Sequence, residues 1–586
     1  MNPQLLLAYF ARISEAPDAV SRLRRFILDL SVRGRLVEQN SNDEPASEIL
    51  KRINAEKTRL AKAGIIKKLD SIALPTDPKF SFPMPSGWAA STLQSLCISV
   101  TDGDHIPPPK ADQGVPFLVI GNVRSQTLNF AGCRHVSEQY YKALDAIRRP
   151  QKGDILYTLV GSYGIPVMIT DERQFCVQRH IGILRPSPSI NARFLSRALE
   201  SKWVFDQATA CATGIAQKTV PLAGLRQILI PLPPLSEQHR IVAKVDELMA
   251  LCDRLEAAQG ERETRRVRLA AASHHYLNNG VNAEDLPAHA HFSINHLSTI
   301  TTRPEHIPAL RRTILSLAVR GQLVSQNPTD ESVSELLTRI QAEKARLIKE
   351  GILRKEKPLA AVANDEVPFA VPTTWRWARI GTCSLLTEYG TSVKSDQVAD
   401  GVPVLAMGNI QDGRVVLNDR RKVPHCIDDL PHLYLKRFDL LYNRTNSAEL
   451  VGKTGIYLGD DDAYTFASYL IRIRFLNNLT SPVYANLAMN APYFRATQIV
   501  PELQQQCGQA NVNGSKLRNM MIPLPPLAEQ HRIIAKVDEL MRLCDQLETQ
   551  LSTMQNEKQS LLEAVLNDAL DSGDGAPELK RLLVEA

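Results

Sequence analysis

Two short patterns in the sequence contain residue types that could carry chemistry. The Gly-Lys-Thr run at 452–454 has the form of the end of a phosphate-binding loop, but such a loop needs a glycine five residues before Gly452, where Ser447 stands. His274 and His275 are adjacent, without a cysteine or carboxylate at the spacing of metal ligands. We interpret the first pattern as a turn beside a strand and the second as a solvated helix face.

A third pattern is Asn-Ala-Pro-Tyr at residues 490–493. It is close to the Asn-Pro-Pro-Tyr of amino-methyltransferases, but Ala491 replaces a proline and no glycine-rich cofactor turn precedes it at a suitable place. The sequence shows no convincing nucleophile–base pair. We interpret residues 490–493 as a helix-breaking loop, and the sequence predicts a non-enzymatic chain.

The elements that must position any functional residue are organised around a stretch that occurs twice. The first copy, from Pro231 to Glu256, is PLPPLSEQHRIVAKVDELMALCDRLE, and the second, from Pro523 to Glu548, is PLPPLAEQHRIIAKVDELMRLCDQLE. An internal repeat of this length indicates a duplicated architecture. The copies differ only at Ser236/Ala528, Val242/Ile534, Ala250/Arg542 and Arg254/Gln546.

Each copy predicts a helix with a heptad seam. Apolar residues recur at alternating steps of four and three, which is typical of helices that pack side by side. Such seams predict that the two helices pack on each other, and an ordinary amphipathic helix buried in a core is the alternative. The seam residues are Ile241, Val245, Leu248, Cys252 and Leu255 in the first copy and Ile533, Val537, Leu540, Cys544, Leu547 and Leu551 in the second.

The duplication extends over the whole chain. A helical block around residues 17–66, with Gly34 and Gly64 as helix stops, returns after Leu310. Between block and seam helix lies a region of short β-type runs, such as GDILYTLV at Gly153 and FDLLYNRT at Phe438, with one mainly helical segment from Asn191. This composition predicts a compact α+β domain in each half. The helical parts are alike and the α+β domains diverge, which suggests a constant scaffold that carries two different binding specificities.

The predicted boundaries follow this pattern. An N-terminal helical block spans residues 1–80, the first variable domain 81–230, a central repeated helical region 231–370, the second variable domain 371–522, and a C-terminal repeated helix 523–586.

Composition limits the class of protein. The 586 residues are 44% hydrophobic and 23% charged, as in soluble globular proteins, and no run approaches the roughly 18 apolar residues of a membrane span. The N-terminus lacks the features of a signal peptide. Nine scattered cysteines without a CxxC motif predict neither a disulfide framework nor a zinc site, which fits a reducing cytoplasm. A net charge of +6 permits a nucleic-acid partner without requiring one.

This arrangement resembles the DNA-specificity subunit of type I restriction–modification systems over essentially the full length. The resemblance rests on the PLPPLxEQHR stretch, on the helix behind it, on the Pro-x-x-Trp that ends at Trp88 and Trp375, and on Gly-Asp-Ile-Leu at Gly153. The second domain departs from the last motif, since it has Phe-Asp-Leu-Leu from Phe438. The resemblance implies an α+β fold with a tandem duplication, in which two target-recognition domains are separated by long antiparallel coiled-coil-like helices.

The same resemblance implies function and partners. Each variable domain would read one half of a split, asymmetric site on double-stranded DNA. The chain would assemble with two modification (methyltransferase) subunits and with restriction (motor and nuclease) subunits, which would carry S-adenosylmethionine, ATP and Mg²⁺. The chain itself would carry no cofactor and no metal. A spacer helix of about 25 to 40 residues would be about 40 to 60 Å long, against about 34 Å for one turn of B-DNA.

Base reading and phosphate binding use Arg, Lys, Asn, Gln and stacking side chains. We interpret Trp88 and Trp375 as core residues, and Glu237 to Arg240 with its twin Glu529 to Arg532 as structural. The candidate DNA-binding residues are Lys110, Arg124, Tyr163, Arg179, Gln217 and Lys218 in the first domain and Lys394, Arg414, Asn443, Arg444, Lys453, Asn511 and Lys516 in the second.

Two alternatives stay open at this point. A free-standing DNA methyltransferase would bind S-adenosylmethionine by itself. A coiled-coil adaptor would use the divergent domains to bind proteins. Salt-dependent DNA binding by either isolated domain separates the adaptor from a DNA-specificity subunit.

Overall fold

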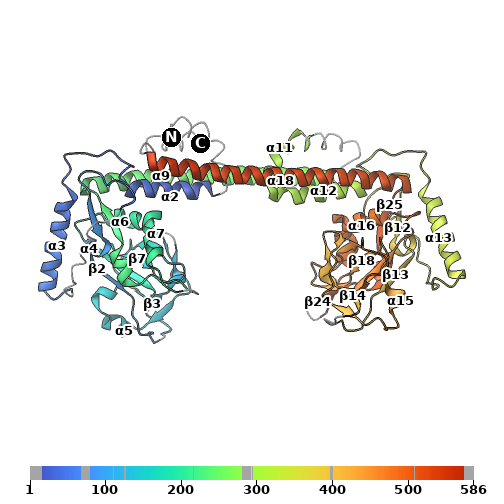
Figure 1. Ribbon diagram of the computed structural model, residues 1–586, viewed down its shortest axis with the longest axis horizontal. Helices are drawn as coiled ribbons and strands as arrows, with labels where there is room; N and C mark the ends of the chain where they lie inside the picture. The colour runs from blue at the N-terminus through green and yellow to red at the C-terminus, as the bar shows by residue number, and fades with distance from the viewer. Residues whose placement is uncertain are drawn as a thin grey trace. The chain divides into compact units, whose positions relative to one another are not determined.

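The chain forms two compact units. The computed structural model describes residues 16, 18–66, 80–109, 111–124, 127–214, 217–279, 289, 292–293, 295–395, 400–506 and 509–572. The first unit comprises Met1–Glu263 and Met554–Ala586, and the second comprises Thr264–Thr553. Both points at which the chain passes between the units lie inside long helices, α9 (Leu235–Asn279) and α18 (Leu527–Ser572). Helix α9 therefore begins in the first unit and ends in the second, and α18 does the reverse (Figure 1).

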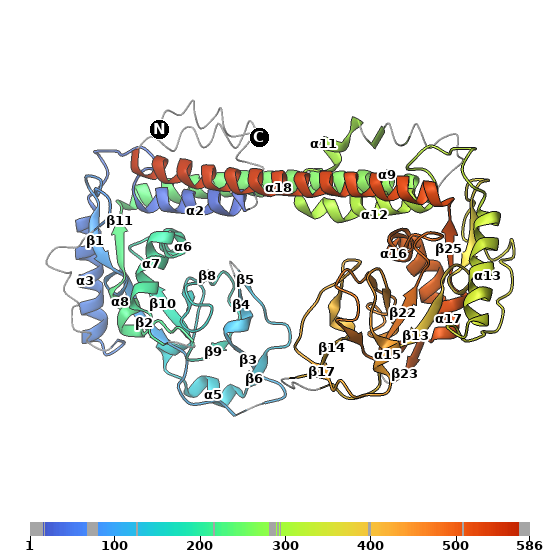
Figure 2. The ribbon, with the colours of Figure 1, turned by 45° about the vertical axis from the view of Figure 1, so that its right-hand side comes forward.

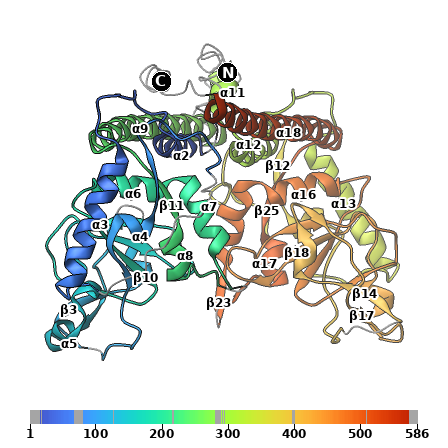
Figure 3. The same cartoon turned by 60° about the vertical axis from the view of Figure 1, so that its left-hand side comes forward.

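In the first unit, helix α2 (Ala19–Val32) packs beside α9, as Figure 3 shows. Leu23, Ile27 and Leu30 are buried against the first seam, which confirms the inward face that the sequence predicts. The last turns of α18 join the same core through Leu562 and Val565. In the second unit, α12 (Ile307–Val319) packs in the same way with the second seam of α18.

The structure corrects two predictions about the long helices. The repeated copies of the seam lie in the cores of different units and do not pack on each other, but the first seam shares its core with the last turns of α18, at Leu562 and Val565, so the predicted packing of the two helices holds through the end of α18 and not through the repeated copy. A helix with one apolar stripe packs on the face that the fold brings to it, and here the repeated block supplies that face. The helices are also longer than predicted, at 45 and 46 residues, because α9 continues through the polar segment beyond residue 256 as far as Asn279.

The first α+β domain contains a four-stranded sheet in the order β2-β10-β7-β8, a three-stranded sheet β6-β3-β9 and two strand pairs. The predicted β-type runs at residues 115, 153 and 178 each contain a strand, and the predicted helical segment from Asn191 contains two helices. The helical block before this domain also contains α3 (Ala46–Lys62). The elements of the domain are β1 (Ala89–Thr92), α4 (Leu93–Leu96), β2 (Cys97–Asp102), β3 (Val115–Leu118), β4 (Val123–Arg124), β5 (Thr127–Leu128), β6 (Arg134–Val136), α5 (Glu138–Ala143), β7 (Ile155–Thr158), β8 (Pro166–Met168), β9 (Cys176–Val177), β10 (Ile181–Pro186), α6 (Ala192–Glu200), α7 (Lys202–Cys211), α8 (Leu222–Gln227) and β11 (Leu229–Leu232).

The second domain has a six-stranded sheet in the order β13-β22-β18-β20-β16-β15 and two three-stranded sheets, β17-β14-β21 and β19-β24-β23. The helical region before this domain also contains α11 (Leu297–Ile300) and α13 (Val333–Lys349). The elements of the domain are β12 (Arg376–Arg379), α14 (Ile380–Cys383), β13 (Leu386–Tyr389), β14 (Val402–Leu405), β15 (Ile410–Gln411), β16 (Arg414–Val415), β17 (Lys422–Val423), α15 (Leu430–Leu433), β18 (Leu440–Asn443), β19 (Thr445–Asn446), β20 (Thr454–Ile456), β21 (Thr465–Phe466), β22 (Leu470–Arg474), α16 (Pro482–Asn490), β23 (Gln504–Gln506), β24 (Gln509–Asn511), α17 (Gly514–Asn519) and β25 (Met521–Leu524).

Each domain is closed at its base by a pair of strands. Strand β1 pairs antiparallel with β11, so the chain enters and leaves the first domain side by side (Figure 2). Strand β12 pairs with β25 in the same way in the second domain. The polypeptide between the paired strands is thus an insertion on the helical scaffold, and in the first unit part of its core is continuous with that of α2 and α9.

A repeated network attaches each domain to its long helix. The indole Nε1 of Trp88 donates to Glu237 Oε2 at 3.0 Å, and Gln39 Nε2 donates to Glu237 Oε1 at 2.7 Å. Gln238 accepts from the backbone N–H of Asn191 at 2.9 Å and so holds the start of α6. The twin residues do the same in the second unit. There the donor–acceptor pairs are Trp375–Glu529, Gln326–Glu529 and Ser481–Gln530, at 3.0, 2.7 and 2.8 Å.

This network confirms two predictions. Both tryptophans are buried, with 9% and 1% of their surface exposed. The Glu-Gln-His-Arg segments are structural, because their Glu and Gln side chains are buried and bonded within one unit. Arg240 also pairs with Asp43, and Arg532 with Asp330, at 2.7 Å.

In the described part of the chain, none of the helices combines the length and the apolar character that crossing a bilayer requires.

Candidate nucleic-acid interface

In the first domain, four segments meet at one end of the main sheet. The N–H of Leu159 donates to the carbonyl of His180 at 2.9 Å, and its carbonyl accepts from Val220 at 2.8 Å. Gly161 N–H donates to the carbonyl of Lys218 at 3.0 Å. We call this set, residues 102–105, 159–164, 178–180 and 213–219, the first loop edge; residues 215 and 216 lie outside the described chain.

The second domain builds the same edge from matching hydrogen bonds. The N–H of Arg444 donates to the carbonyl of Tyr469 at 3.1 Å, and its carbonyl accepts from Val512 at 2.9 Å. Thr445 forms an antiparallel backbone pair with Asn511, and in the first domain Val160 forms the equivalent antiparallel bridge with Thr219. Residues 389–394, 444–447, 467–469 and 509–512 form the second loop edge. The backbone scaffold is therefore shared although the sequences diverge.

One position on each loop edge must be glycine, because a side chain there would collide with the backbone of a neighbouring strand. A Cβ on Gly103 would lie 2.0 Å from the carbonyl oxygen of Val177, and a Cβ on Gly390 would lie 2.2 Å from that of Phe466. Neither distance is possible for a real side chain, so both positions require glycine. Each glycine thus lets its segment lie directly against the end of a neighbouring strand, β9 in the first domain and β21 in the second.

Four of the first domain's candidate residues gather on the first loop edge: Tyr163, Arg179, Gln217 and Lys218. Arg179, Gln217 and Lys218 are exposed. Tyr163 is half-buried, because its ring stacks on Phe205 with centroids 5.5 Å apart and its hydroxyl lies 3.0 Å from Thr209 Oγ1. Their roles toward DNA stay predictions.

The remaining first-domain candidates lie elsewhere. Arg124 is exposed at the end of strand β4, in a two-stranded hairpin with β5. Lys110 lies outside the described residues.

In the second domain, Arg444 and Asn511 come together. Arg444 donates to the carbonyl of Ser468 at 3.3 Å and to Asn511 Oδ1 at 3.4 Å, and its guanidinium lies 4.9 Å from the ring centroid of Tyr389. Lys394 is exposed on the same loop edge. An arginine held between an aromatic face and an amide can present further N–H groups to a ligand.

Two other candidates are engaged within the domain. Asn443 is 1% exposed inside strand β18, so its side chain does not reach the surface. Lys516 lies in helix α17 and pairs with Glu502 at 3.0 Å. Arg414 and Lys453 are exposed, on strand β16 and in the turn before β20.

Sequence reasoning missed the exposed aromatic residues of the second loop edge. Tyr389 and Tyr469 have 42% and 51% of their surface exposed. Tyrosine occurs both buried and exposed in folded proteins, so composition alone gives no signal for them. Their grouping becomes visible only when segments separated by about 80 residues are brought together by strand pairing.

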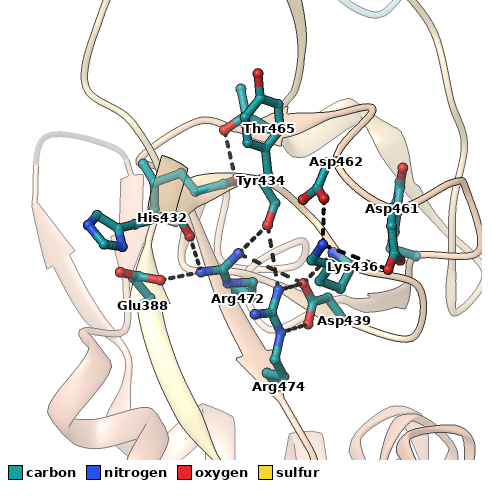
Figure 4. Close-up of polar contacts among 12 residues, drawn as sticks. Glu388, His432, Tyr434, Lys436, Asp439, Asp461, Asp462, Thr465, Arg472 and Arg474 are labelled. Carbon is teal, nitrogen blue, oxygen red and sulfur yellow. Dashed lines mark hydrogen bonds and ion pairs between the residues drawn. The ribbon is translucent and has the colours of Figure 1, made fainter. Parts of the chain in front are cut away.

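The second domain also contains a buried charged cluster that the first lacks (Figure 4). Arg472 is 1% exposed, pairs with Glu388, and donates to the carbonyls of His432 and Tyr434. Arg474 makes a two-pronged pair with Asp439, and both distances are 2.6 Å.

Among its described residues, the first domain has the second of these pairs, Arg185 with Asp154 at 2.9 Å, and not the first. A cavity of about 440 Å³ in the second domain is lined in part by Lys436 and Arg474. Both side chains already pair with carboxylates, Lys436 with Asp462 and Arg474 with Asp439. These pairs favour a structural role for the charges around the cavity.

The three patterns with catalytic or metal-binding residue types are structural. Gly452 has a φ of 91° in the turn before strand β20, as predicted for a turn beside a strand. Asn490 ends helix α16 and donates to the carbonyl of Thr454 at 3.0 Å. His274 is half-buried beside Thr313 at 2.9 Å, so the prediction of a solvated face holds for His275 and is wrong for His274.

Metal-ligating side chains do not gather in the described part of the chain: no group of three or more His, Cys, Asp or Glu there is placed to hold an ion. Cys252 and Cys544 are buried in the two helical cores, as the seam predicts.

The fold defines a class of protein in which a duplicated scaffold carries two domains with one backbone plan and different side chains at the loop edges. Comparison with known proteins identifies the family. The model of the type I restriction modification DNA specificity domain matches residues 85–262 and 409–554. The type I restriction enzyme EcoEI specificity subunit of Escherichia coli is 31% identical over 579 residues, and the match covers 94% of each chain.

Two further similar proteins are a relative by sequence and a solved structure. The EcoAI specificity subunit of Escherichia coli is 31% identical over 572 residues and 94% of each chain. The HsdS subunit from Thermoanaerobacter tengcongensis is 18% identical with a TM-score of 0.42, over 84% of this chain and 99% of that chain.

The chain belongs to the family of type I restriction–modification DNA-specificity subunits. This membership confirms the resemblance and the duplicated α+β fold predicted from the sequence. Specificity subunits are the non-catalytic members of type I systems, so the prediction that the chain is not an enzyme is confirmed by the family as well.

Proposed function

We propose that the chain binds double-stranded DNA and that each variable domain reads one half of a bipartite, asymmetric site. The observation that carries this proposal is the pair of loop edges, which share their backbone hydrogen bonds and differ in their side chains. Base identity is read by side chains on a positioned backbone. Two domains with one backbone and different side chains would read two different half-sites, so the whole site would not be palindromic.

The constant helices support a proposal about partners. Arg24 pairs with Asp253 and Glu256 on α9, and Arg311 pairs with Asp545 and Glu548 on α18, so both helical scaffolds are built alike. Two equivalent scaffolds offer equivalent surfaces to two copies of one partner. The proposed partners are two modification subunits, joined for cleavage by restriction subunits.

The cofactors belong to those partners in this proposal. S-adenosylmethionine would serve the modification subunits, and ATP and Mg²⁺ the restriction subunits, with none bound by this chain. The proposed location of the complex is the cytoplasm, where the cell's DNA is accessible to it.

Mapping of methylated bases tests the proposal. The chain is co-expressed with its modification partner, and methylation is mapped across the host genome. A split, asymmetric motif that disappears when this chain is deleted is the expected result. Methylation that persists unchanged without the chain would remove the DNA-specificity role and favour the adaptor alternative. Binding to duplex DNA should also weaken steeply with added salt.

A further inference from the structure

The two loop edges can be compared residue by residue, because their strand registers match. Asp102 pairs with Gly182 in the first domain, and Tyr389 pairs with Ile471 in the second. Backbone hydrogen bonds show that Leu159 and Arg444 are equivalent. The N–H of each donates to the segment before the last long strand of the sheet, and the carbonyl of each accepts from the segment around residue 220 or 512. The four equivalent pairs are Asp102 and Tyr389, Leu159 and Arg444, His180 and Tyr469, and Thr219 and Asn511.

The chemistry differs at every one of these positions. In the first domain, Leu159 is 4% exposed and Asp102 is 5% exposed, with Asp102 bonded to His105 at 3.1 Å. Neither side chain is available to a ligand at the surface. In the second domain, the corresponding positions carry an arginine over an exposed tyrosine ring.

Arg444 is positioned but not saturated. Its two terminal nitrogens each carry two hydrogens, and the contacts within the described chain use one on each, to Ser468 and Asn511 at 3.3 and 3.4 Å. These distances are long for N–H···O bonds, so a stronger acceptor can replace them. The Tyr389 ring beneath the guanidinium limits the directions in which the group can turn.

We infer that Arg444 is a specificity-determining residue of the second domain, which reads a guanine in the second half-site, and that the first half-site lacks the equivalent contact. Arginine is suited to guanine because two of its N–H groups meet the O6 and N7 acceptors in the major groove. Asn511 and Tyr389 act as positioning residues for the guanidinium. The inference rests on the proposed function, since it assigns a base to one residue of that interface.

The test uses the co-expressed complex with two variants of Arg444. Arg444→Leu installs the residue that the first domain has at this backbone position. Arg444→Lys keeps the charge but removes the two-pronged geometry. We expect both variants to lose one guanine from the second half-site of the mapped motif, with a roughly 5- to 150-fold weaker preference for guanine, while the first half-site stays unchanged.

Arg420→Leu is the matched control, because Arg420 is an exposed arginine of the same domain outside the loop edge. It should leave both half-sites unchanged. An unchanged second half-site in Arg444→Leu and Arg444→Lys would overturn the inference. If Arg444→Leu yields no assembled complex, the motif of Arg444→Lys decides in the same way. Failure of the proposed function looks different: the wild-type motif would then not depend on this chain.

Discussion

The indole N–H of Trp88 donates a hydrogen bond to the carboxylate of Glu237, 149 residues further along the chain. The pair joins the residue just before strand β1 to the first turn of the long helix, and Trp375 and Glu529 repeat it in the second unit. The duplication has kept this bond while the domains on either side of it diverged. The attachment of domain to helix is therefore the constant part of the design, and it can be tested directly.

Removing the Glu237 carboxylate should destabilise the first unit. Glu237→Ala leaves the buried Trp88 N–H without an acceptor, at a cost of about 1–3 kcal/mol. Glu237→Gln keeps an acceptor oxygen and should cost less. Chemical unfolding followed by tryptophan fluorescence measures both variants. Equal losses in the two variants would show that the hydrogen bond to Trp88 contributes little.

The same carboxyl groups predict a pH dependence. Burial raises the pKa of Glu237 and of Glu529 above the usual 4.5, against the opposing effect of the tryptophan hydrogen bonds. A folded-state pKa above the unfolded one means that the protonated form is favoured by folding. The resulting stabilisation is fully present below pH 4.5 and is lost as the pH rises through the raised pKa.

The double variant Glu237→Gln, Glu529→Gln removes this titration. Between pH 4.5 and 7, the unfolding free energy of the wild type should fall relative to that of the double variant. Unfolding curves at a series of pH values measure the difference, in which the titration of all other groups cancels. A difference that stays constant across this range would contradict the raised pKa values.

The buried Arg472 should be costly to remove alone and cheaper to remove with its partner. Arg472→Ala removes the donor of the carbonyl of His432 and of the partly exposed Glu388, and leaves the carbonyl of Tyr434 only a long contact of 3.5 Å to Arg474, and an unsatisfied buried polar group costs about 1–3 kcal/mol. Strand register places Ile183 and Thr101 of the first domain at the positions of Arg472 and Glu388.

The double variant Arg472→Ile, Glu388→Thr therefore installs a pair that this backbone already accommodates. It should lose less unfolding free energy than Arg472→Ala. Asp439 keeps Arg474 as its partner in both variants, which makes the comparison a matched one. A double variant that is less stable than Arg472→Ala would show that the second domain does not accommodate the residue pair found at the equivalent positions of the first.

Domain exchange should change one half-site only. The strands β1 and β11 close the first domain, so residues 89–232 can be replaced by the equivalent segment of a relative without altering the helices. Methylation mapping should show a new first half-site, with the second half-site and the gap unchanged. A change in both half-sites at once would contradict the autonomy of the domains.

Helix length should control the gap between the half-sites. The chain passes between the two units within α9, between Glu263 and Thr264, and within α18, between Thr553 and Met554. Seven residues inserted at both points keep the seams in phase and add about 10 Å of helix. The mapped gap should lengthen, by at most about three base pairs at 3.4 Å each. An insertion in α9 alone is the control. It should disturb assembly, because α9 would then be seven residues longer while α18 keeps its length.

Much of the architecture could be predicted from local patterns. The duplication, the helical blocks with their inward-facing Leu23 and Ile27, and the β-type runs that became β3 and β7 depend on residue spacing, which the chain carries in its order. The burial of Trp88 was predicted for the same reason, since a large aromatic residue at a repeated position favours a core.

Only the tertiary structure decided which surfaces meet. The seam around Val245 could pack on any apolar face, and the fold paired it with α2. Asn443 has the residue type of a base reader, yet strand pairing buries it. The equivalence of Leu159 and Arg444 is invisible in the divergent sequences, because it is defined by backbone hydrogen bonds between segments far apart in the chain. Local order determines periodicity and turns, whereas the partners of a side chain depend on contacts that form only on folding.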